Sequence, residues 1–321
     1  MNIHEVPMTD VRRKLAELEG QDVKSPTDWD TRKRILDRHA NGRELQGLCL
    51  SWSKTHDKVR LRYGAVSVWA GYNGHNKSTI LSQVAATASQ FVKVGIGSFE
   101  MELEDTYNLM AQQVAGTPDV DPKWLNDFCT WAQERIYVYD RLESVPPEQV
   151  TSGVDYMAGV LGCKLIVLDS LMMCRGVVDD MEREKDFISL LIGLAKHYQI
   201  HIAVVHHMKK PQHGDEANQP GKYDLRGSAA ISDLADSVFI CWKNKELVEL
   251  RRKTESGIKL TTDEQTRYNK IKDHAEQKLI VAKQRHAPFE GPIALWQHNS
   301  RQFTGSSDKR PMSLKIERLA A

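Results

Sequence analysis

The sequence lacks long hydrophobic runs and any regular cysteine spacing. No window approaches the ~18 apolar residues of a membrane-spanning helix, and the N-terminal segment MNIHEVPMTDVRRKLAELEG lacks the apolar stretch of a signal peptide. The five cysteines are scattered, odd in number and never spaced as CxxC, which argues against a disulfide framework and against a zinc site. We therefore expect a cytoplasmic protein that does not contact a membrane.

An excess of charge of either sign is also absent. The 44 basic and 43 acidic residues give a net charge of +1, so any contact with nucleic acid must come from a local basic patch. The hydrophobic fraction of 40% and the charged fraction of 27% are typical of globular proteins. The 321 residues therefore fit one large domain with a small extension.

The sequence pattern changes near residue 45 and again near residue 305. Residues 1–45 hold two polar segments with helix start and stop signals, which predicts a helical N-terminal extension. In residues 46–305 apolar strands alternate with helical patterns, which indicates an α/β fold with a doubly wound, mostly parallel sheet and helices on both faces. Residues 306–321 are expected to form a C-terminal tail. The expected strands are 65–71, 92–99, 135–140, 163–174, 200–208, 238–243 and 278–285.

A phosphate-binding turn is predicted at residues 71–78, GYNGHNKS, which follow an apolar strand and open a helix. In GxxxxGK[ST] the backbone N–H groups cradle phosphates, the lysine (Lys77) neutralises their charge, and the hydroxyl (Ser78) ligates Mg²⁺. The alternative is an ordinary Gly/Asn turn. The candidate nucleotide-binding residues are Gly71, Asn73, Gly74, His75, Asn76, Lys77, Ser78 and Thr79.

Asn76 departs from this motif, because it stands where the second glycine belongs. Asparagine is the non-glycine residue that best tolerates a positive φ, so the loop can still close. Its side chain could nevertheless crowd the phosphates. We therefore expect weakened or retuned ATP binding.

Polar residues stand at three further strand ends, where a doubly wound sheet binds its ligand. Glu100 follows one strand and could activate the attacking water, and Asp169 ends another and could hold Mg²⁺. His206 and His207 end a third, and either could sense the γ-phosphate. Each also has a structural explanation: Glu100 as a helix N-terminal acid, Asp169 as a cap, and the histidines as solvated or metal-binding residues.

The motifs GYNGHNKST, GSFEMELEDT, LIVLDS, VVHHMKKP, YDLRGSAAISDLADS and AKQRH…FEGPIAL occur in that order. Together they resemble the DnaB-type replicative helicases, whose motor domain is RecA-like. The chain looks most like the helicase half of the phage primase-helicase and of mitochondrial Twinkle. The resemblance covers roughly residues 45–303 and does not include a primase domain.

The resemblance implies roles for individual residues. Glu100 corresponds to the catalytic base, Asp169 to the Walker B acid, and His207 to the γ-phosphate sensor. Arg285 corresponds to the arginine finger, which reaches the neighbouring subunit's ATP, with Lys283 beside it. The expected cofactors are therefore ATP and Mg²⁺.

A second implication concerns DNA. The stretch from residue 209 to 226 corresponds to the loop that lines the family's central channel and contacts single-stranded DNA through phosphates. The alternative is a solvated surface loop, because Asp215 and Glu216 dilute its charge. The expected DNA-binding residues are Lys209, Lys210, Lys222, Arg226 and, in a second loop after Asp169, Arg175.

The resulting hypothesis is an ATP-dependent, ring-forming replicative DNA helicase that translocates 5′ to 3′ on single-stranded DNA in a bacterial or phage-infected cell. We expect a homo-oligomer, a hexamer by resemblance, with primase and polymerase as further partners. One alternative is a RecA-fold ATPase that acts in recombination or loading without unwinding. Another is a binding module whose hydrolysis has decayed, which only Asn76 supports. Residues 29–39 either dock on an adjacent subunit or fold back on their own core, and Trp296 is a weak candidate for the adenine pocket.

Overall fold

The computed structural model describes residues 29–40, 47–141, 144–174, 176–177, 180–209, 218–227, 229–312 and 314. The chain separates into two compact units, residues 1–45 and 46–321. The described part of the first unit is helix α2 (Trp29–Ala40), and the first of the two expected helical segments lies outside the described residues.

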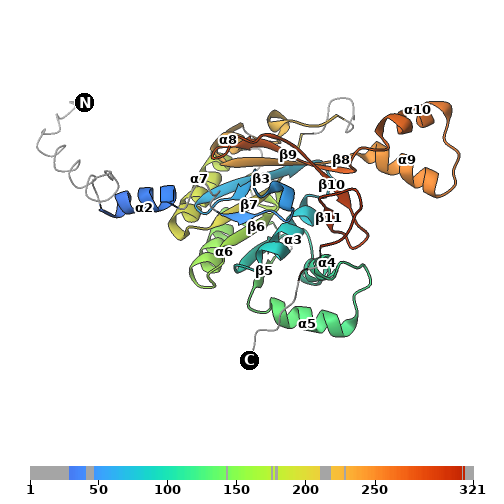
Figure 1. The fold of residues 1–321 in the computed structure, drawn as a ribbon. Coiled ribbons are helices and arrows are strands. Elements are labelled where there is room, and N and C mark those ends of the chain that lie inside the picture. Colours follow the sequence, from blue (N-terminus) through green and yellow to red (C-terminus); the bar gives the residue numbers. More distant parts are fainter. Residues whose placement is uncertain are drawn as a thin grey trace, which may run out of the picture. The chain divides into compact units, whose positions relative to one another are not determined.

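A nine-stranded sheet forms the centre of the second unit, in the order β11-β10-β9-β8-β3-β7-β6-β4-β5 (Figure 1). Neighbours from β8 to β5 pair in parallel, whereas β9, β10 and β11 are antiparallel, which confirms the mostly parallel sheet. The strands are β3 (Ala65–Gly71), β4 (Val94–Ser98), β5 (Ile136–Asp140), β6 (Leu165–Asp169), β7 (His201–His207), β8 (Ser237–Lys243), β9 (Gln277–Gln284), β10 (Gly291–Gln297) and β11 (Phe303–Thr304). Two short strands, β1 (Leu48–Cys49) and β2 (Arg60–Leu61), form a separate antiparallel pair.

Helices cover both faces of the sheet, as predicted. Side chains alternate along a strand, so Trp69 of β3 packs into one core while Val68 and Ala70 pack into the other. The first core contains residues of α3 (Lys77–Ala88), α4 (Leu103–Ala115) and α5 (Pro122–Ala132). The second contains residues of α6 (Pro147–Gly159), α7 (Met181–Tyr198) and α8 (Ala229–Leu234). Short 3-10 turns are η1 (Ser53–Thr55), η2 (Leu171–Met173) and η4 (Lys222–Asp224).

A helical hairpin, α9 (Lys245–Glu255) and α10 (Thr262–Ile271), is inserted between β8 and β9 and projects from the sheet (Figure 1). The sequence indicated only a charged stretch here. A capping box of Thr261 and Glu264 begins α10, and Lys253 bonds Glu264 across the hairpin at 2.7 Å. Polar caps and ion pairs therefore define this hairpin.

The described part of the C-terminal tail packs against the rest of its own unit. The side-chain amide of Gln302 donates to the Met312 carbonyl and accepts from the Met312 N–H, both at 2.8 Å. Lys309 pairs with Glu276 at 2.8 Å. No helix in the part of the chain that the structure describes is long and apolar enough to span a membrane.

Candidate active site

The loop between β3 and α3 has the backbone of a phosphate-binding turn. Gly74 and Asn76 both adopt left-handed conformations, with φ of 75° and 65°, so the expected tolerance of Asn76 for a positive φ is confirmed. Position 71 has room only for glycine, because a Cβ there would lie 2.5 Å from the Cys241 carbonyl oxygen. The Lys77 ammonium donates to the carbonyls of Gly71 at 3.1 Å and Tyr72 at 3.2 Å. Burial lowers the pKa of Lys77.

The Asn76 side chain is bonded to the sheet. Its Nδ2 donates to Oε1 of Gln277 at 3.0 Å, and Gln277 Nε2 donates to the His75 carbonyl at 3.3 Å. The buried His75 ring accepts the Lys243 N–H at 3.0 Å. The amide that could have crowded the phosphates is therefore held against β9. Ser78 and Thr79 lie in the first turn of α3.

Glu100, just beyond the end of β4, lies beside His207, the last residue of β7. The His207 Nε2 is 3.8 Å from Glu100 Oε1, and its Nδ1 donates to the Asn73 side-chain oxygen at 3.0 Å. The Ser170 hydroxyl donates to the same Oε1 of Glu100. The neighbouring His207 lowers the pKa of Glu100, and burial opposes this shift. The contacts connect the phosphate loop to the ends of three other strands.

Asp169 lies beside Ser78, and the Ser78 hydroxyl bonds its carboxylate. Burial raises the pKa of Asp169 to about 6, and the bond from Ser78 opposes this shift. Both residues also line a small cavity of about 30 Å³. A hydroxyl and a carboxylate are hard oxygen donors, which suit Mg²⁺. No group of three His, Cys, Asp or Glu suited to a metal occurs among the residues described.

His206 and His207 separate, because successive strand residues point to opposite faces. His206 is buried, and its Nε2 donates to the Arg226 carbonyl at 2.5 Å. Burial lowers the pKa of His206. Of the two histidines, only His207 faces Glu100. We call the region of Lys77, Glu100, Asp169 and His207, at the carboxyl ends of the parallel strands, the phosphate edge.

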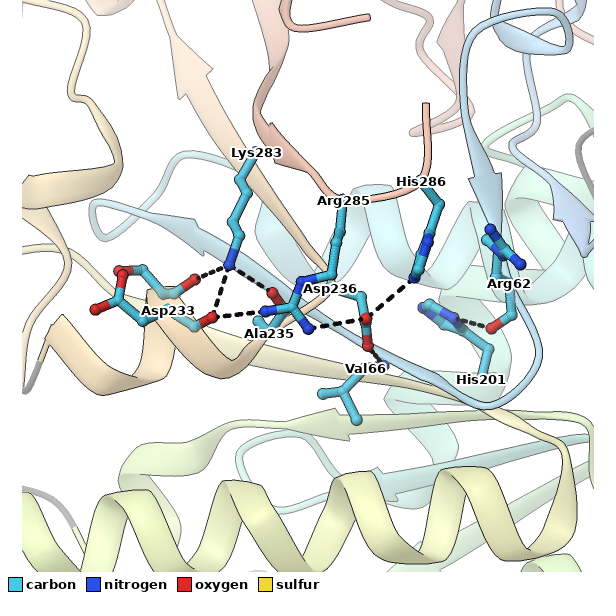
Figure 2. A network of polar contacts seen from close by, with 10 residues as sticks. Arg62, Val66, His201, Asp233, Ala235, Asp236, Lys283, Arg285 and His286 are labelled. Carbon is cyan, nitrogen blue, oxygen red and sulfur yellow. Dashed lines mark hydrogen bonds and ion pairs between the residues drawn. The ribbon is translucent and has the colours of Figure 1, made fainter. Parts of the chain in front are cut away.

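Lys283 and Arg285 lie elsewhere, as Figure 2 shows. The Lys283 ammonium donates to the carbonyls of Ser232, Asp233 and Ala235, at 2.7 to 2.8 Å, at the end of α8. Burial lowers the pKa of Lys283. Arg285 donates to the Asp233 carbonyl at 2.9 Å and pairs with Asp236 at 3.4 Å. Both basic groups therefore contact their own chain.

The register of β9 locates these residues relative to the phosphate loop. Gln277 pairs with Lys243, next to the loop, whereas Gln284 pairs with Ser237 at the beginning of β8. Seven residue steps of ~3.3 Å separate the two ends by roughly 23 Å. We call the region of His201, Asp236, Lys283 and Arg285 the far edge. Lys283 and Arg285 therefore lie at the opposite end of the sheet from the phosphate loop of their own chain.

The basic loop after β7 is described at Lys209 and at residues 218–227. The Lys209 N–H donates to the Asp224 carbonyl at 2.8 Å, and the Arg226 N–H donates to the His207 carbonyl at 3.0 Å, so both ends of the loop lie beside the phosphate edge. The Lys222 ammonium lies 5.4 Å from the Tyr223 ring, which is 79% exposed. Lys210 and Arg175 lie outside the described residues.

Several residues of these regions were not predicted from sequence. Ser170 could have been suggested by its position after Asp169, and Tyr223 by its place in a basic loop. Nothing in the sequence indicated a role for Gln277, because Gln277 and its partner Asn76 are separated by 201 positions along the chain. The candidate Trp296 lies 5.1 Å from the Lys54 ammonium, which also donates to the Ala294 carbonyl.

Residues 60–305 match the DnaB-like helicase C terminal domain. The chain belongs to this family. It is 26% identical over 206 residues to the DNA helicase/primase of Enterobacteria phage T3, a match that covers 58% of this chain and 36% of that protein. This DnaB-like chain therefore matches about a third of the length of that relative.

Solved structures share the fold. One solved ATPase domain is 12% identical with a TM-score of 0.70, and the match covers 88% of this chain and 99% of that one. A DnaB-like replicative helicase, described with its interactions with primase, is 13% identical with a TM-score of 0.63 over 93% of this chain and 72% of that one. These likenesses confirm the RecA-like α/β fold expected for the DnaB family.

Proposed function

We propose that this chain is the motor of an ATP- and Mg²⁺-dependent replicative DNA helicase that forms a homo-oligomeric ring, a hexamer by family, and translocates 5′ to 3′ on single-stranded DNA. The observation that carries the proposal is the division between the two edges of the sheet. The phosphate edge brings together Lys77, Glu100 and Asp169, the proposed nucleotide-binding lysine, base and metal-binding acid, whereas the proposed arginine finger, Arg285, lies at the far edge.

At the phosphate edge, Lys77 would neutralise the β- and γ-phosphates, and Glu100 would take a proton from the attacking water. Ser170 and His207 both contact Oε1 of Glu100, which fixes the carboxylate for this task. Asn73 in turn orients His207, the proposed γ-phosphate sensor. Ser78 and Asp169 would hold Mg²⁺, which supplies phosphate charge neutralisation when bound.

At the far edge, Arg285 would act on the nucleotide of a neighbouring subunit. An arginine that stabilises transition-state charge contributes ~10³ to 10⁵ in rate. In the single chain, Asp236 and Asp233 hold its guanidinium. Lys283 is bonded to two carbonyls of α8 and to that of Ala235, which follows it, so Lys283 would support the position of Arg285 or move to the same neighbouring nucleotide.

The loop of residues 209–226 would contact single-stranded DNA. Lys209, Lys210, Lys222 and Arg226 would meet backbone phosphates, with Arg175 in the second loop. The exposed Tyr223 beside Lys222 adds an aromatic surface on which a base can stack. The Arg226 N–H donates to the His207 carbonyl, so a proposed DNA-binding residue is hydrogen-bonded to the proposed γ-phosphate sensor.

Further partners follow from the relatives. One structural relative is described with its interactions with primase, and the phage T3 relative is a DNA helicase/primase, so we propose primase as a partner of this chain. Polymerase is proposed as a partner from the family resemblance alone. The proposed setting is the cytoplasm of a bacterial or phage-infected cell.

The test is ATP hydrolysis with and without single-stranded DNA, combined with native mass measurement and unwinding of forked duplexes with either tail. The proposal predicts strong DNA stimulation, a hexamer, and unwinding that requires a 5′ tail. DNA-stimulated hydrolysis without unwinding would favour a RecA-fold ATPase that acts in recombination or loading. Nucleotide binding with no hydrolysis under any condition would favour a decayed binding module.

A further inference from the structure

The rear of the phosphate loop is tied to the base of the α9–α10 hairpin. The Lys243 N–H, at the end of β8, donates to the His75 ring at 3.0 Å. The Lys245 ammonium, at the beginning of α9, donates to the Asn73 carbonyl at 3.2 Å. Gln277, the first residue of β9, contacts both His75 and Asn76. The loop is therefore anchored on both strands that carry the hairpin.

The Gln277 amide makes two complementary bonds within this anchor. Its oxygen accepts the Asn76 Nδ2–H at 3.0 Å, and its nitrogen donates to the His75 carbonyl at 3.3 Å. Reversing the Gln277 amide would bring two donors together at Asn76 and two acceptors together at His75. The Gln277 side chain is only 1% exposed, so a lost partner would leave a buried polar group unsatisfied.

We propose that Gln277 and Asn76 are a positioning pair that holds the phosphate loop in its nucleotide-binding conformation. A glycine at position 76 could adopt the same φ of 65° but could not bond Gln277. The pair restricts the loop before nucleotide arrives, which lowers the cost of ordering it on binding. The departure of Asn76 from the motif is thus compensated by a partner on β9. This inference rests on the nucleotide site of the proposed function.

The test is titration of ADP with Mg²⁺ against the full chain and its Asn76→Gly, Gln277→Leu and double variants. Each single substitution should weaken ADP binding about 3- to 10-fold, as expected for one lost hydrogen bond in a buried setting. The double variant should bind no more weakly than the weaker single variant, because both changes break the same pair. In hydrolysis assays Gln277→Leu should raise the KM for ATP by a larger factor than it lowers kcat.

Gln284→Leu is the matched control. It lies on the same strand, and its side-chain amide donates to the Lys58 and Phe289 carbonyls at 3.0 and 3.1 Å, far from the phosphate loop. It should lower the Tm yet leave ADP affinity unchanged. Any of three results would overturn the positioning pair. These are unchanged ADP affinity in both single variants, additive losses of affinity in the double variant, and a loss of ADP affinity in Gln284→Leu equal to that in Gln277→Leu.

Asn76→Gly and one further variant, Lys77→Ala, keep the outcomes separate. If Gln277→Leu does not fold, Asn76→Gly decides alone, because its side chain is only partly buried, and wild-type ADP affinity in it would overturn the pair. Lys77→Ala should abolish ADP binding. Undiminished ADP binding in Lys77→Ala would overturn the nucleotide site itself, a different outcome from failure of the pair.

Discussion

The phosphate edge and the far edge of the same sheet differ in how their charged groups are satisfied. At the phosphate edge, Glu100, Asp169 and His207 contact side chains that themselves belong to the site. At the far edge, Lys283 and Arg285 bond backbone carbonyls at the end of α8 and just after it, and Asp236 accepts the Val66 N–H at 3.1 Å (Figure 2). Side chains that contact one another, as at the phosphate edge, suit chemistry on a bound ligand. Basic groups held by backbone carbonyls, as at the far edge, suit contact with another molecule.

Strand β9 connects the two edges. Gln277 at its beginning anchors the phosphate loop, and Arg285 directly follows its end. Strand β9 therefore runs from the phosphate loop to the far edge. The comparison supports the proposal that one chain supplies two different halves of a nucleotide site.

The largest expected effect is on Arg285. Arg285→Ala should reduce hydrolysis by about 1,000-fold while ADP affinity stays at the wild-type value, because the finger stabilises only transition-state charge. Steady-state hydrolysis and ADP titration measure the two quantities. Arg310→Ala, on an exposed arginine that pairs with Asp308, is the control and should have no effect. A wild-type rate of hydrolysis in Arg285→Ala would contradict the proposed role of the far edge in hydrolysis.

A second prediction concerns stability at the far edge. The buried His201 donates to the Arg62 carbonyl at 2.8 Å and accepts from Ser67, and burial lowers its pKa to about 4. As pH falls from 6.5 to 4, the unfolded chain gains a proton on this residue that the folded chain does not. The free energy of unfolding should therefore fall by roughly 3 kcal/mol from this residue alone.

Urea unfolding across this pH range checks the His201 prediction. His201→Gln should remove this share of the pH dependence, whereas His197→Gln, on an exposed histidine of α7, should retain it. An identical pH slope in wild type and His201→Gln would contradict the assignment.

At the phosphate edge, Glu100→Gln should lower hydrolysis about 100-fold, because an amide cannot take the proton of the attacking water. ADP affinity and Tm should change little. Glu104→Gln, on the exposed surface of α4, is the matched control for an acid near this position. Loss of folding rather than of turnover in Glu100→Gln would place this carboxylate among structural residues.

The smallest expected effect is on the DNA loop. Tyr223→Ala should weaken binding of single-stranded DNA about 10-fold, the loss expected for one stacked base. Fluorescence anisotropy with an oligonucleotide measures it, and Tyr156→Ala, on a tyrosine of α6 that is 55% exposed, should bind normally. Equal DNA affinity in both variants would remove Tyr223 from the DNA site.

Much of the fold could be predicted because the parallel strands are apolar on both faces, as in the buried β3 and β7. The α9–α10 hairpin could not, since its residues are polar and its caps and ion pairs become visible only in three dimensions. Strand β10 was missed because Pro292 interrupts its pattern.

The phosphate edge was predictable for a related reason. Glu100, Asp169 and His207 follow parallel strands, and the carboxyl ends of such strands converge. The role of Gln277 was not predictable, because a lone glutamine at the beginning of a strand carries no motif. The location of Lys283 and Arg285 at the other edge required the antiparallel direction of β9, which strand patterns do not specify.

The central claim is that the two edges of one sheet serve two different nucleotides. The most direct test mixes Lys77→Ala chains with Arg285→Ala chains, each inactive alone, and measures hydrolysis without DNA in oligomers shown by native mass spectrometry to contain both. An intact Lys77 then meets an intact Arg285 at about a quarter of the subunit junctions. The account predicts recovered hydrolysis in the mixture, and mixed oligomers that remain as inactive as either variant alone would contradict it.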